Sequence, residues 1–390
     1  MKRRSSVALL GAAALVAGSA LISGPAVAGS NGGVGEPRVI TDGLFTPLKL
    51  AVNDHGTAYV SQNFIGELTK VARDGTKTPF ASAPGEEVGG VSEHDGTVYW
   101  TTTGEGSAKM FAQRRGGEPR QIADIWAHEN STNPDQGTTY GFRDLPAECA
   151  AQFPADNPAS YTGAVDSHPY ATLVTDRHKY VADAGANAIF EVGRHGRVTT
   201  VATLPGVGTV VTAEAAEAQQ LPECAVGHTY YFEFVPTDIE QSRDGRLYVT
   251  SLPGGPEDAS LGARGAVYEL KAKGGGHHHK SGSNGAKVKK VAGGFVGAVD
   301  LALLPDRKVA VAELFGGAEG QGQVSLFKLG SRSANDPAKR QTLALASPAA
   351  VEWVGGRHSG KLYVTTDAFV GGEPGPTGKL QVLSIGSHRH

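Results

Sequence analysis

The sequence predicts an all-β fold, and two features of its 390 residues indicate it: abundant turn-forming residues and a short strand motif that recurs along the chain. Glycine contributes 54 residues and proline 21, which would interrupt helices every few residues but would supply the many turns of a protein built from short strands. Apolar residues make up 39% and the formal net charge is −3, so a disordered chain is excluded. The same charge gives no electrostatic basis for binding nucleic acid.

The first 28 residues predict an export signal. Three cationic residues at positions 2–4 precede an apolar stretch at 7–22, and Ala26-Val27-Ala28 forms a cleavage site before Gly29. A membrane anchor is the alternative, but the stretch is shorter than the ~20 residues that a span needs. We therefore expect a secreted monomer, extracellular or associated with the cell wall, with no membrane span after cleavage near Ala28.

Two cysteines, Cys149 and Cys224, make up the whole cysteine content. An exported protein meets an oxidising environment, so we expect them to form a disulfide bond. A metal pair or a reactive thiol is the competing interpretation, and the absence of a C-x-x-C spacing disfavours it.

A turn followed by a short strand occurs six times, and five of the six strands have a central tyrosine. The strands are residues 58–60, 98–100, 179–181, 247–249, 309–311 and 362–364. The first two centres, Tyr59 and Tyr99, are 40 residues apart, which suits a unit of four short strands with three turns. Such a unit is one blade of a β-propeller.

The first unit shows all four strands, which we name A to D: residues 48–52, 57–61, 67–72 and 77–81. The sixth unit ends with the strand at 379–385 and lacks strand D. Residues 38–41 resemble 289–292, which also precede an A strand, so we expect the N-terminal segment to complete the last blade and remove exposed sheet edges. The sequence thus predicts a six-bladed β-propeller in one domain, residues 29–390. An open solenoid and a two-sheet sandwich are the alternatives.

Several segments carry a family resemblance. Residues 181–189, Val-Ala-Asp-Ala-Gly-Ala-Asn-Ala-Ile, resemble the NHL-type propeller repeat. Segments 166–170, 212–216, 235–240 and 252–258 resemble bacterial exported proteins of the ScyD/ScyE family, from about Val39 to the C-terminus. The family name derives from cyanobacterial proteins linked to scytonemin pigment biosynthesis, and most members elsewhere have no established activity. The resemblance therefore implies the propeller fold and leaves the chemistry open.

Two insertions, at 125–165 and 205–235, are D-to-A connections of neighbouring blades, and each carries one cysteine. Since strands in a blade are antiparallel, both insertions emerge on one face, where we expect them to form a cap. Residues 252–265 form a third long loop on that face, and loops longer than ~12 residues are usually functional or disordered. We expect one short helix, at 214–220, and no other in the mature chain.

The candidate site is where the A strands enter the central channel. Aligning these strands places Asp238 and Asp300 at equivalent positions in adjacent blades, facing a narrow pore. An uncompensated carboxylate pair is costly, so we predict either a raised pKa or a bound cation, Ca²⁺ or Mg²⁺. The alternative is that both aspartates accept hydrogen bonds from backbone N–H groups at the strand starts.

Other candidate residues surround this pair. His168 and Asp166 are candidate proton acceptors, and the candidate residues of the channel rim are Glu86, Glu87, Tyr170 and Thr237. Asp183 and Glu313, at the ends of B strands, are interpreted as structural. His277, within a Gly-, Ser- and Lys-rich segment at 274–285, begins a run of three histidines that suggests either surface metal capture or a low-complexity insertion.

The chain has no G-x-S-x-G, H-E-x-x-H, P-loop or Rossmann glycine motif. Three functional hypotheses remain. The first is binding of a small molecule or cation in the capped channel. The second is a metal-dependent propeller enzyme, similar to lactonases, lyases or strictosidine synthases, with His168 or Asp166 as proton acceptor. The third is an extracellular scaffold that binds a protein or a wall polymer.

Overall fold

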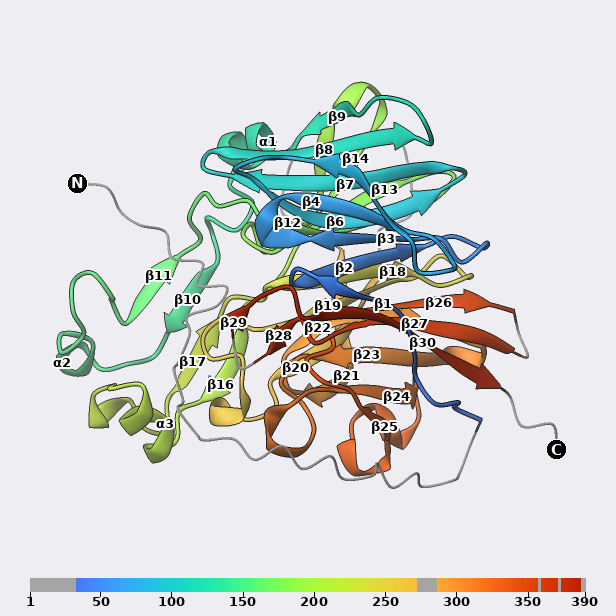
Figure 1. Cartoon of the computed structure of the whole chain (residues 1–390). Coiled ribbons are helices and arrows are strands. Elements are labelled where there is room, and N and C mark those ends of the chain that lie inside the picture. Colours follow the sequence, from blue (N-terminus) through green and yellow to red (C-terminus); the bar gives the residue numbers. More distant parts are fainter. Residues whose placement is uncertain (1–32, 272–285, 357–358, 371–372, 387–390) are drawn as a thin grey trace.

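The computed structural model, shown in Figure 1, describes residues 33–271, 286–356, 359–370 and 373–386. The predicted export signal and the histidine-rich segment lie outside these ranges. Within them the chain is mainly β, with seven four-stranded antiparallel sheets and one two-stranded hairpin. In the described residues, no helix combines the length and the apolar character that crossing a membrane requires.

The first sheet consists of β2 (Pro47–Val52), β3 (Ala58–Gln62), β4 (Glu67–Val71) and β5 (Lys77–Ser82), in that order. Each strand agrees with the predicted bounds to within one residue at either end. The turn between β2 and β3 is closed by the N–H of Asn53 donating to the carbonyl of Thr57 at 3.0 Å. Gly56 in this turn has a φ of +79°, a conformation that glycine adopts without steric cost.

Four further sheets repeat this order of strands. They comprise β6 (Glu87–His94), β7 (Thr97–Gly104), β8 (Ser107–Arg114) and β9 (Arg120–Asp124); β12 (Pro169–Val174), β13 (Lys179–Asp183), β14 (Ala188–Val192) and β15 (Val198–Thr203); β18 (Pro236–Gln241), β19 (Leu247–Ser251), β20 (Gly265–Lys271) and β21 (Lys287–Phe295); and β22 (Ala298–Leu303), β23 (Lys308–Glu313), β24 (Gln323–Lys328) and β25 (Gln341–Ala344).

The sixth sheet contains both ends of the described chain. Its strands are β26 (Ala350–Gly355), β27 (Ser359–Thr366), β30 (Gly378–Gly386) and β1 (Arg38–Leu44). β1 pairs antiparallel with β30, with Arg38 opposite Val382 and Val39 opposite Gln381. An additional hairpin, β28 (Phe369–Val370) and β29 (Glu373–Pro374), follows β27. These two strands are too short for the sequence pattern to predict.

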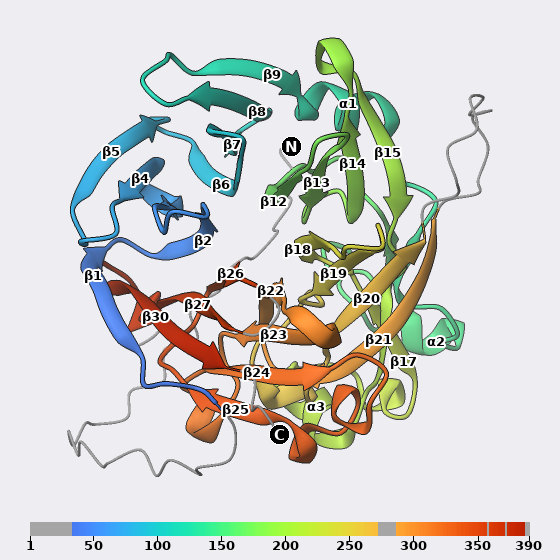
Figure 2. The same cartoon turned by 90° about the vertical axis from the view of Figure 1, so that its right-hand side faces the viewer.

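The first strand of each sheet contacts the first strands of its neighbours. β2 contacts β6 and β26, β12 contacts β6 and β18, and β22 contacts β18 and β26. Figure 2 shows the six sheets arranged around a common centre, with these strands innermost. Aromatic rings fill the space between neighbouring sheets, as where Phe80 packs edge-on against Tyr59 and Trp100.

The two predicted insertions share the seventh sheet, which we call the cap sheet. It consists of β10 (Thr139–Phe142), β11 (Ser160–Thr162), β16 (Val207–Val210) and β17 (Thr229–Phe232), in the order β11-β10-β17-β16. It projects to the left in Figure 1. Cys149 and Cys224 form a disulfide with a Cα–Cα distance of 5.9 Å, which confirms the predicted pairing.

The expectation of a single helix is wrong, because the structure has α1 (Ile125–Thr132), α2 (Ala147–Ala150) and α3 (Ala213–Ala218). α3 corresponds to the predicted helix, and the Thr212 side chain caps it by accepting a hydrogen bond from the N–H of Ala215. α1 contains few strong helix formers, so propensity does not reveal it. The Asp124 side chain caps α1 and Ile125 is fully buried, which together stabilise it.

Candidate functional site

At the centre of the ring a lysine meets the two predicted aspartates. The Nζ of Lys49, on β2, lies 2.6 Å from Oδ2 of Asp300 and 3.8 Å from Oδ1 of Asp238. It also donates to the carbonyl of Val299 at 3.1 Å and lies 4.8 Å from the ring centre of Tyr170. All three charged side chains are buried, so water cannot compensate the charges of the two aspartates, and the ammonium group of Lys49 does so instead.

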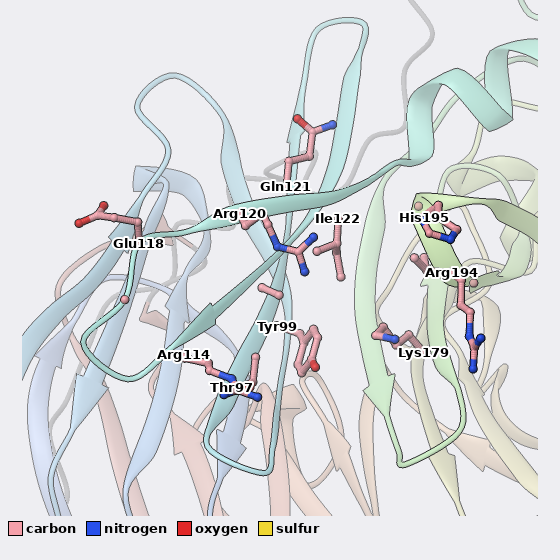
Figure 3. A pocket seen from close by; sticks show the side chains of 15 residues that line it. Thr97, Tyr99, Arg114, Glu118, Arg120, Gln121, Ile122, Lys179, Arg194 and His195 are labelled. Carbon is pink, nitrogen blue, oxygen red and sulfur yellow. The ribbon is translucent and has the colours of Figure 1, made fainter.

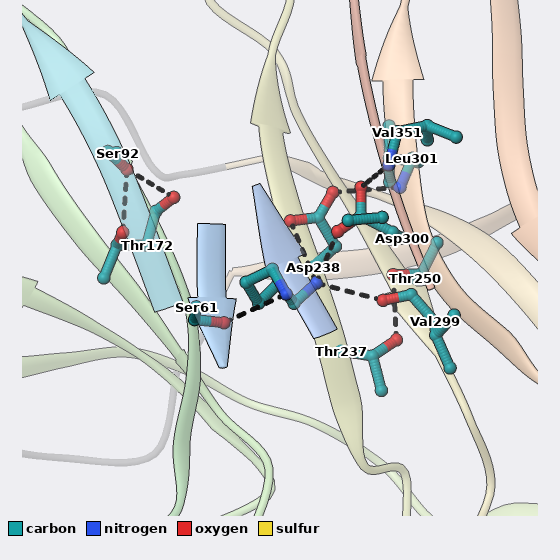
Figure 4. Close-up of polar contacts among 12 residues, drawn as sticks. Ser61, Ser92, Thr172, Thr237, Asp238, Thr250, Val299, Asp300, Leu301 and Val351 are labelled. Atoms are coloured by element: carbon teal, nitrogen blue, oxygen red, sulfur yellow. Dashed lines mark hydrogen bonds and ion pairs between the residues drawn. The ribbon is translucent and has the colours of Figure 1, made fainter. Parts of the chain in front are cut away.

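Backbone groups complete the shell around the two carboxylates, as Figure 4 shows. The N–H of Leu301 donates to Oδ2 of Asp238 at 3.0 Å, and the N–H of Val351 donates to Oδ1 of Asp300 at 3.2 Å. The backbone alternative considered from the sequence is therefore present, with donors from the adjacent inner strand. Thr237, a predicted rim residue, is buried and donates to the carbonyl of Ala298 at 2.9 Å.

The single positive charge of Lys49 does not compensate all the carboxyl groups around it. Glu240 on β18 and Glu352 on β26 lie close enough to the aspartates for their charges to interact. Burial raises the pKa of Asp300, Glu240 and Glu352 well above the usual range, and the neighbouring carboxylates raise it further. Burial also raises the pKa of Asp238, although Lys49 opposes the shift. Both glutamates keep part of their surface exposed, but the surrounding protein still desolvates them.

Lys49 bears on the predicted metal site. The sequence predicts Ca²⁺ or Mg²⁺ between Asp238 and Asp300 because two buried carboxylates need a positive charge nearby. The ammonium group of Lys49 supplies such a charge. A cation between Asp238 and Asp300 stays a prediction. The sequence contained the signal for the lysine, because the alignment of A strands places Lys49 at the position equivalent to both aspartates.

Beside this centre lies a small cavity, which we call the mouth cavity. It has room for about one water molecule, with a volume of ≈ 20 Å³. Apolar side chains from several sheets dominate its lining, and four titratable groups join them. The apolar residues are Leu48, Phe64, Leu252, Val299, Leu314, Ala349 and Phe369; the titratable ones are Glu87, His168, Tyr170 and Glu257; Asn63 completes the lining.

His168 and Glu87 form the polar part of the mouth cavity. The Nε2 of His168 lies 3.1 Å from Oε2 of Glu87. Burial opposes a positive charge on His168, but the hydrogen bond and the charge of Glu87, with Asp183 and Asp166 adding to them, leave its pKa raised. Asp183 accepts from the N–H of His168 at 2.7 Å and from Oγ of Ser167 at 2.6 Å, contacts that agree with the structural role predicted for it.

Glu257 comes from the long loop that the sequence predicts at 252–265. Burial raises its pKa to about 7, against the opposing charge of Arg264. The Arg264 side chain holds the loop by donating to the carbonyls of Gly254, at 3.0 Å, and Pro256. Glu257 is a site residue that sequence analysis missed, because nothing in the loop's sequence indicates which residue faces inward.

The remaining predicted residues lie elsewhere. Glu86 accepts from Oγ of Ser107 at 2.8 Å and from Nζ of Lys109 at 3.2 Å, so it faces β8, and it does not line the mouth cavity. Asp166 does not line it either; burial and then the charge of Asp183 raise its pKa to about 6. The structure thus brings His168, Glu87 and Tyr170 together at the mouth cavity. Glu313 accepts from Val296, Gln323 and Ser325, as its predicted structural role requires.

A larger groove of ≈ 930 Å³ lies between β9 and the β14–β15 turn, shown in Figure 3. Its lining includes five basic side chains: Arg114, Arg120, Lys179, Arg194 and His195. Glu118 is the one acidic residue of the lining, and in Figure 3 it points away from Arg120 and Lys179. The groove is therefore positively charged in a chain whose net charge is negative.

Comparisons with known proteins support the fold. No protein-family model matches the chain, and no curated protein matches it. The PQQ-bound aldose sugar dehydrogenase of Streptomyces coelicolor matches with 15% identity and a TM-score of 0.53, over 90% of this chain and 98% of that chain. An oxidoreductase of Thermus thermophilus named as a glucose dehydrogenase matches with 16% identity and a TM-score of 0.51, over 89% of this chain and 99% of that chain. A Bacteroides thetaiotaomicron protein of unknown function matches with 10% identity and a TM-score of 0.52, over 90% of this chain and 76% of that chain. The neighbours are propeller-type proteins, and at these identities the likeness shows the fold alone.

Proposed function

We propose that this chain is an exported, closed six-bladed propeller of the ScyD/ScyE kind that binds a small molecule at the mouth cavity. The pairing of β1 with β30 supports closure, and the succession of contacts between inner strands supports six blades. The Cys149–Cys224 disulfide supports export, since such bonds persist in oxidising environments.

One observation carries the binding proposal: polar groups with shifted pKa values converge in an otherwise apolar cavity. The pKa of His168 is raised by Glu87 and that of Glu257 by burial, and ligand sites typically combine apolar walls with a few such groups. The ring centroids of Phe64 and Phe369 lie 6.2 Å apart, and both rings line the cavity. A ligand larger than water must therefore move these rings. The aromatic lining favours a small aromatic molecule with one hydrogen-bonding group.

Ligand-observed NMR with phenol as the probe tests the proposal. Wild-type protein is expected to bind phenol, and Ala349→Leu, which fills the cavity with a larger apolar side chain, is expected to weaken binding at least tenfold. Ala338→Leu makes the same change at an exposed position and is the matched control. Circular dichroism confirms that each variant is folded. Equal binding by Ala349→Leu and wild type would place the ligand elsewhere and refute the proposal.

A catalytic role at the same cavity is the second candidate, and the His168–Glu87 pair favours it. The carboxylate orients the imidazole, so His168 would accept a proton from a bound substrate or water. A metal-dependent form, similar to lactonases, would also require the cation predicted at Asp238 and Asp300. Incubation with γ-butyrolactone, with and without Ca²⁺, is the test. Ring opening that His168→Gln abolishes supports catalysis, whereas phenol binding without any turnover supports binding alone.

A further inference from the structure

A second group of acidic side chains lies at the base of the cap, outside the mouth cavity. Glu129 is on α1 and Asp135 is in the turn that follows, and both are essentially unexposed, at 0% and 1%. The charges of Asp183, Asp135 and Asp166 act on Glu129. Among the described residues, no lysine or arginine forms an ion pair with any of these four carboxylates. His168 lowers the pKa of Asp166 and Asp183, so the charge left without compensation is that of Glu129 and Asp135.

Four oxygen atoms of this group lack a partner. Both carboxylate oxygens of Glu129, Oδ1 of Asn133 and Oδ1 of Asp135 are buried, and no well-aligned hydrogen bond from the described part of the chain reaches them. The backbone N–H of Asp166 lies close enough to Glu129 to lower its pKa, but burial outweighs that effect. An unsatisfied buried acceptor costs free energy, and the cost is larger for a charged group. Protonating Glu129 would remove its charge and supply one donor, but one donor cannot satisfy all four oxygens. These four oxygens therefore lack a positively charged group that binds oxygen.

The other polar atoms of these side chains are firmly held. Oδ2 of Asp135 accepts from the Tyr140 hydroxyl at 2.9 Å and from Nδ2 of Asn187 at 3.1 Å. Nδ2 of Asn133 donates to the carbonyl of Gly163 at 3.1 Å. These bonds fix the direction of each side chain and leave one oxygen of each free, as the supporting contacts of a metal ligand do.

Local backbone geometry brings Asn133 and Asp135 together. Asn133 ends α1 with a φ of +35°, a left-handed conformation that asparagine tolerates better than most residues. Both side chains meet Gly163: a Cβ atom there would lie 2.0 Å from Oδ1 of Asp135. Glycine at position 163 is therefore required for this close approach.

We propose that Glu129, Asn133 and Asp135 bind a divalent cation, with Ca²⁺ as the best chemical match. All the free ligand atoms are oxygens, and a glutamate with both oxygens free can bind Ca²⁺ through both. Water and main-chain oxygens would complete a shell of six to eight. The site would tie the first cap insertion to the segment before β12. It shares no residue with the mouth cavity or with Asp238 and Asp300.

A different group offers three ligand atoms within 4.8 Å of one another: His94, Asp95 and Asp176. Their side chains are 29%, 89% and 86% exposed, so water satisfies them without an ion. These exposed side chains need no cation, so one of them can serve as the control in a Ca²⁺-binding experiment.

Thermal unfolding of the full mature chain, in EDTA and in increasing CaCl₂, tests the inference. Wild-type protein is expected to melt at a higher temperature as Ca²⁺ rises, because a ligand that binds only the folded state stabilises it. Glu129→Gln and Asp135→Asn are expected to weaken the apparent Ca²⁺ affinity at least tenfold. Asp176→Asn, the matched control at the exposed group, should keep the wild-type response. A parallel titration with MgCl₂ is expected to give a smaller shift.

Two outcomes would overturn the inference: a wild-type melting temperature that Ca²⁺ does not change, or a shift that survives in Glu129→Gln but disappears in Asp176→Asn. Terbium luminescence supplies an independent readout, since Tb³⁺ occupies Ca²⁺ sites and a nearby aromatic ring sensitises it. Emission that Ca²⁺ displaces and that Glu129→Gln loses supports the site. Retained emission in Glu129→Gln contradicts it, even if the melting experiment is complicated by a change in stability.

Discussion

Buried carboxylates lie both at the centre of the six sheets and under the cap, but only those at the centre have a cationic partner. At the centre, Lys49 lies 2.6 Å from Asp300 and neutralises it within the protein. Under the cap, Glu129 has no such partner, and burial followed by the charges of Asp183 and Asp135 raises its pKa to about 8. The two residues therefore lead to distinct predictions about stability and pH.

Replacing Lys49 with methionine keeps the bulk of the side chain and removes its charge. The variant leaves Asp300 and Asp238 buried without compensation, and we expect the free energy of unfolding at pH 7 to fall by about 3 kcal/mol. The loss should shrink at pH 5, where the carboxyls hold protons more readily. Urea denaturation at both pH values measures it. Lys109→Met breaks the more exposed pair with Glu86 and should cost less than about 1 kcal/mol; equal losses for both variants would contradict the prediction.

Glu129 predicts an unusual pH dependence in the absence of divalent cations. Its pKa is raised from 4.5 to about 8 in the folded state, so the folded chain binds more protons than the unfolded chain between these values. Stability is therefore fully present below about pH 4.5 and falls as pH rises towards 8, by at most about 5 kcal/mol. Urea denaturation in EDTA should show a flatter pH profile for Glu129→Gln. Identical profiles for wild type and variant would show that Glu129 titrates normally.

At the scale of elements, the cap sheet is the part of the fold that depends most on long-range contacts. Its four strands come from two insertions, β10 and β11 from one and β16 and β17 from the other, and the disulfide joins the same two insertions. A short two-stranded hairpin, which is all that either insertion supplies, is marginal by itself. The cystine is therefore expected to maintain the pairing of β10 with β17.

Removing the disulfide by Cys149→Ala with Cys224→Ala tests that role. The bond closes a loop of 75 residues, and its loss should cost roughly 4 kcal/mol in the chain-entropy model. Hydrogen exchange measured by mass spectrometry should accelerate in the cap sheet and remain slow in β2 to β5, which serve as the internal control. Acceleration spread evenly over all sheets would mean that the cap unfolds only with the whole molecule.

At the scale of the whole molecule, the pairing of β1 with β30 joins the N-terminal and C-terminal ends of the described chain. β1 also provides Leu44, which is fully buried beside Leu380 and Val382 in one apolar cluster. A sheet that loses its last strand exposes an edge that can pair with another molecule. The proposal of a closed propeller therefore makes a prediction about association as well as stability.

Deleting residues 29–44 removes β1 and is expected to lower the melting temperature and to produce dimers or aggregates through the edge of β30. Size-exclusion chromatography with light scattering measures the association. Substitution of Val39, which is 47% exposed on β1, by serine changes the surface without removing the strand and should leave the chain monomeric. A deleted chain that stays monomeric and equally stable would argue against closure by this strand.

The sequence by itself determined the strands and the alignment of Asp238 with Asp300, because alternation, turn residues and repeat spacing are local signals. It also determined the cysteine pairing, because the chain has two cysteines and no others. Strands 48–52 and 77–81 needed no knowledge of their neighbours. Tertiary structure alone decided which charges meet. Lys49 is 189 residues from Asp238 and 251 from Asp300 along the chain, and Glu257 comes from a long loop between β19 and β20. Burial and compensation of charge depend on distances through space, which no local pattern encodes.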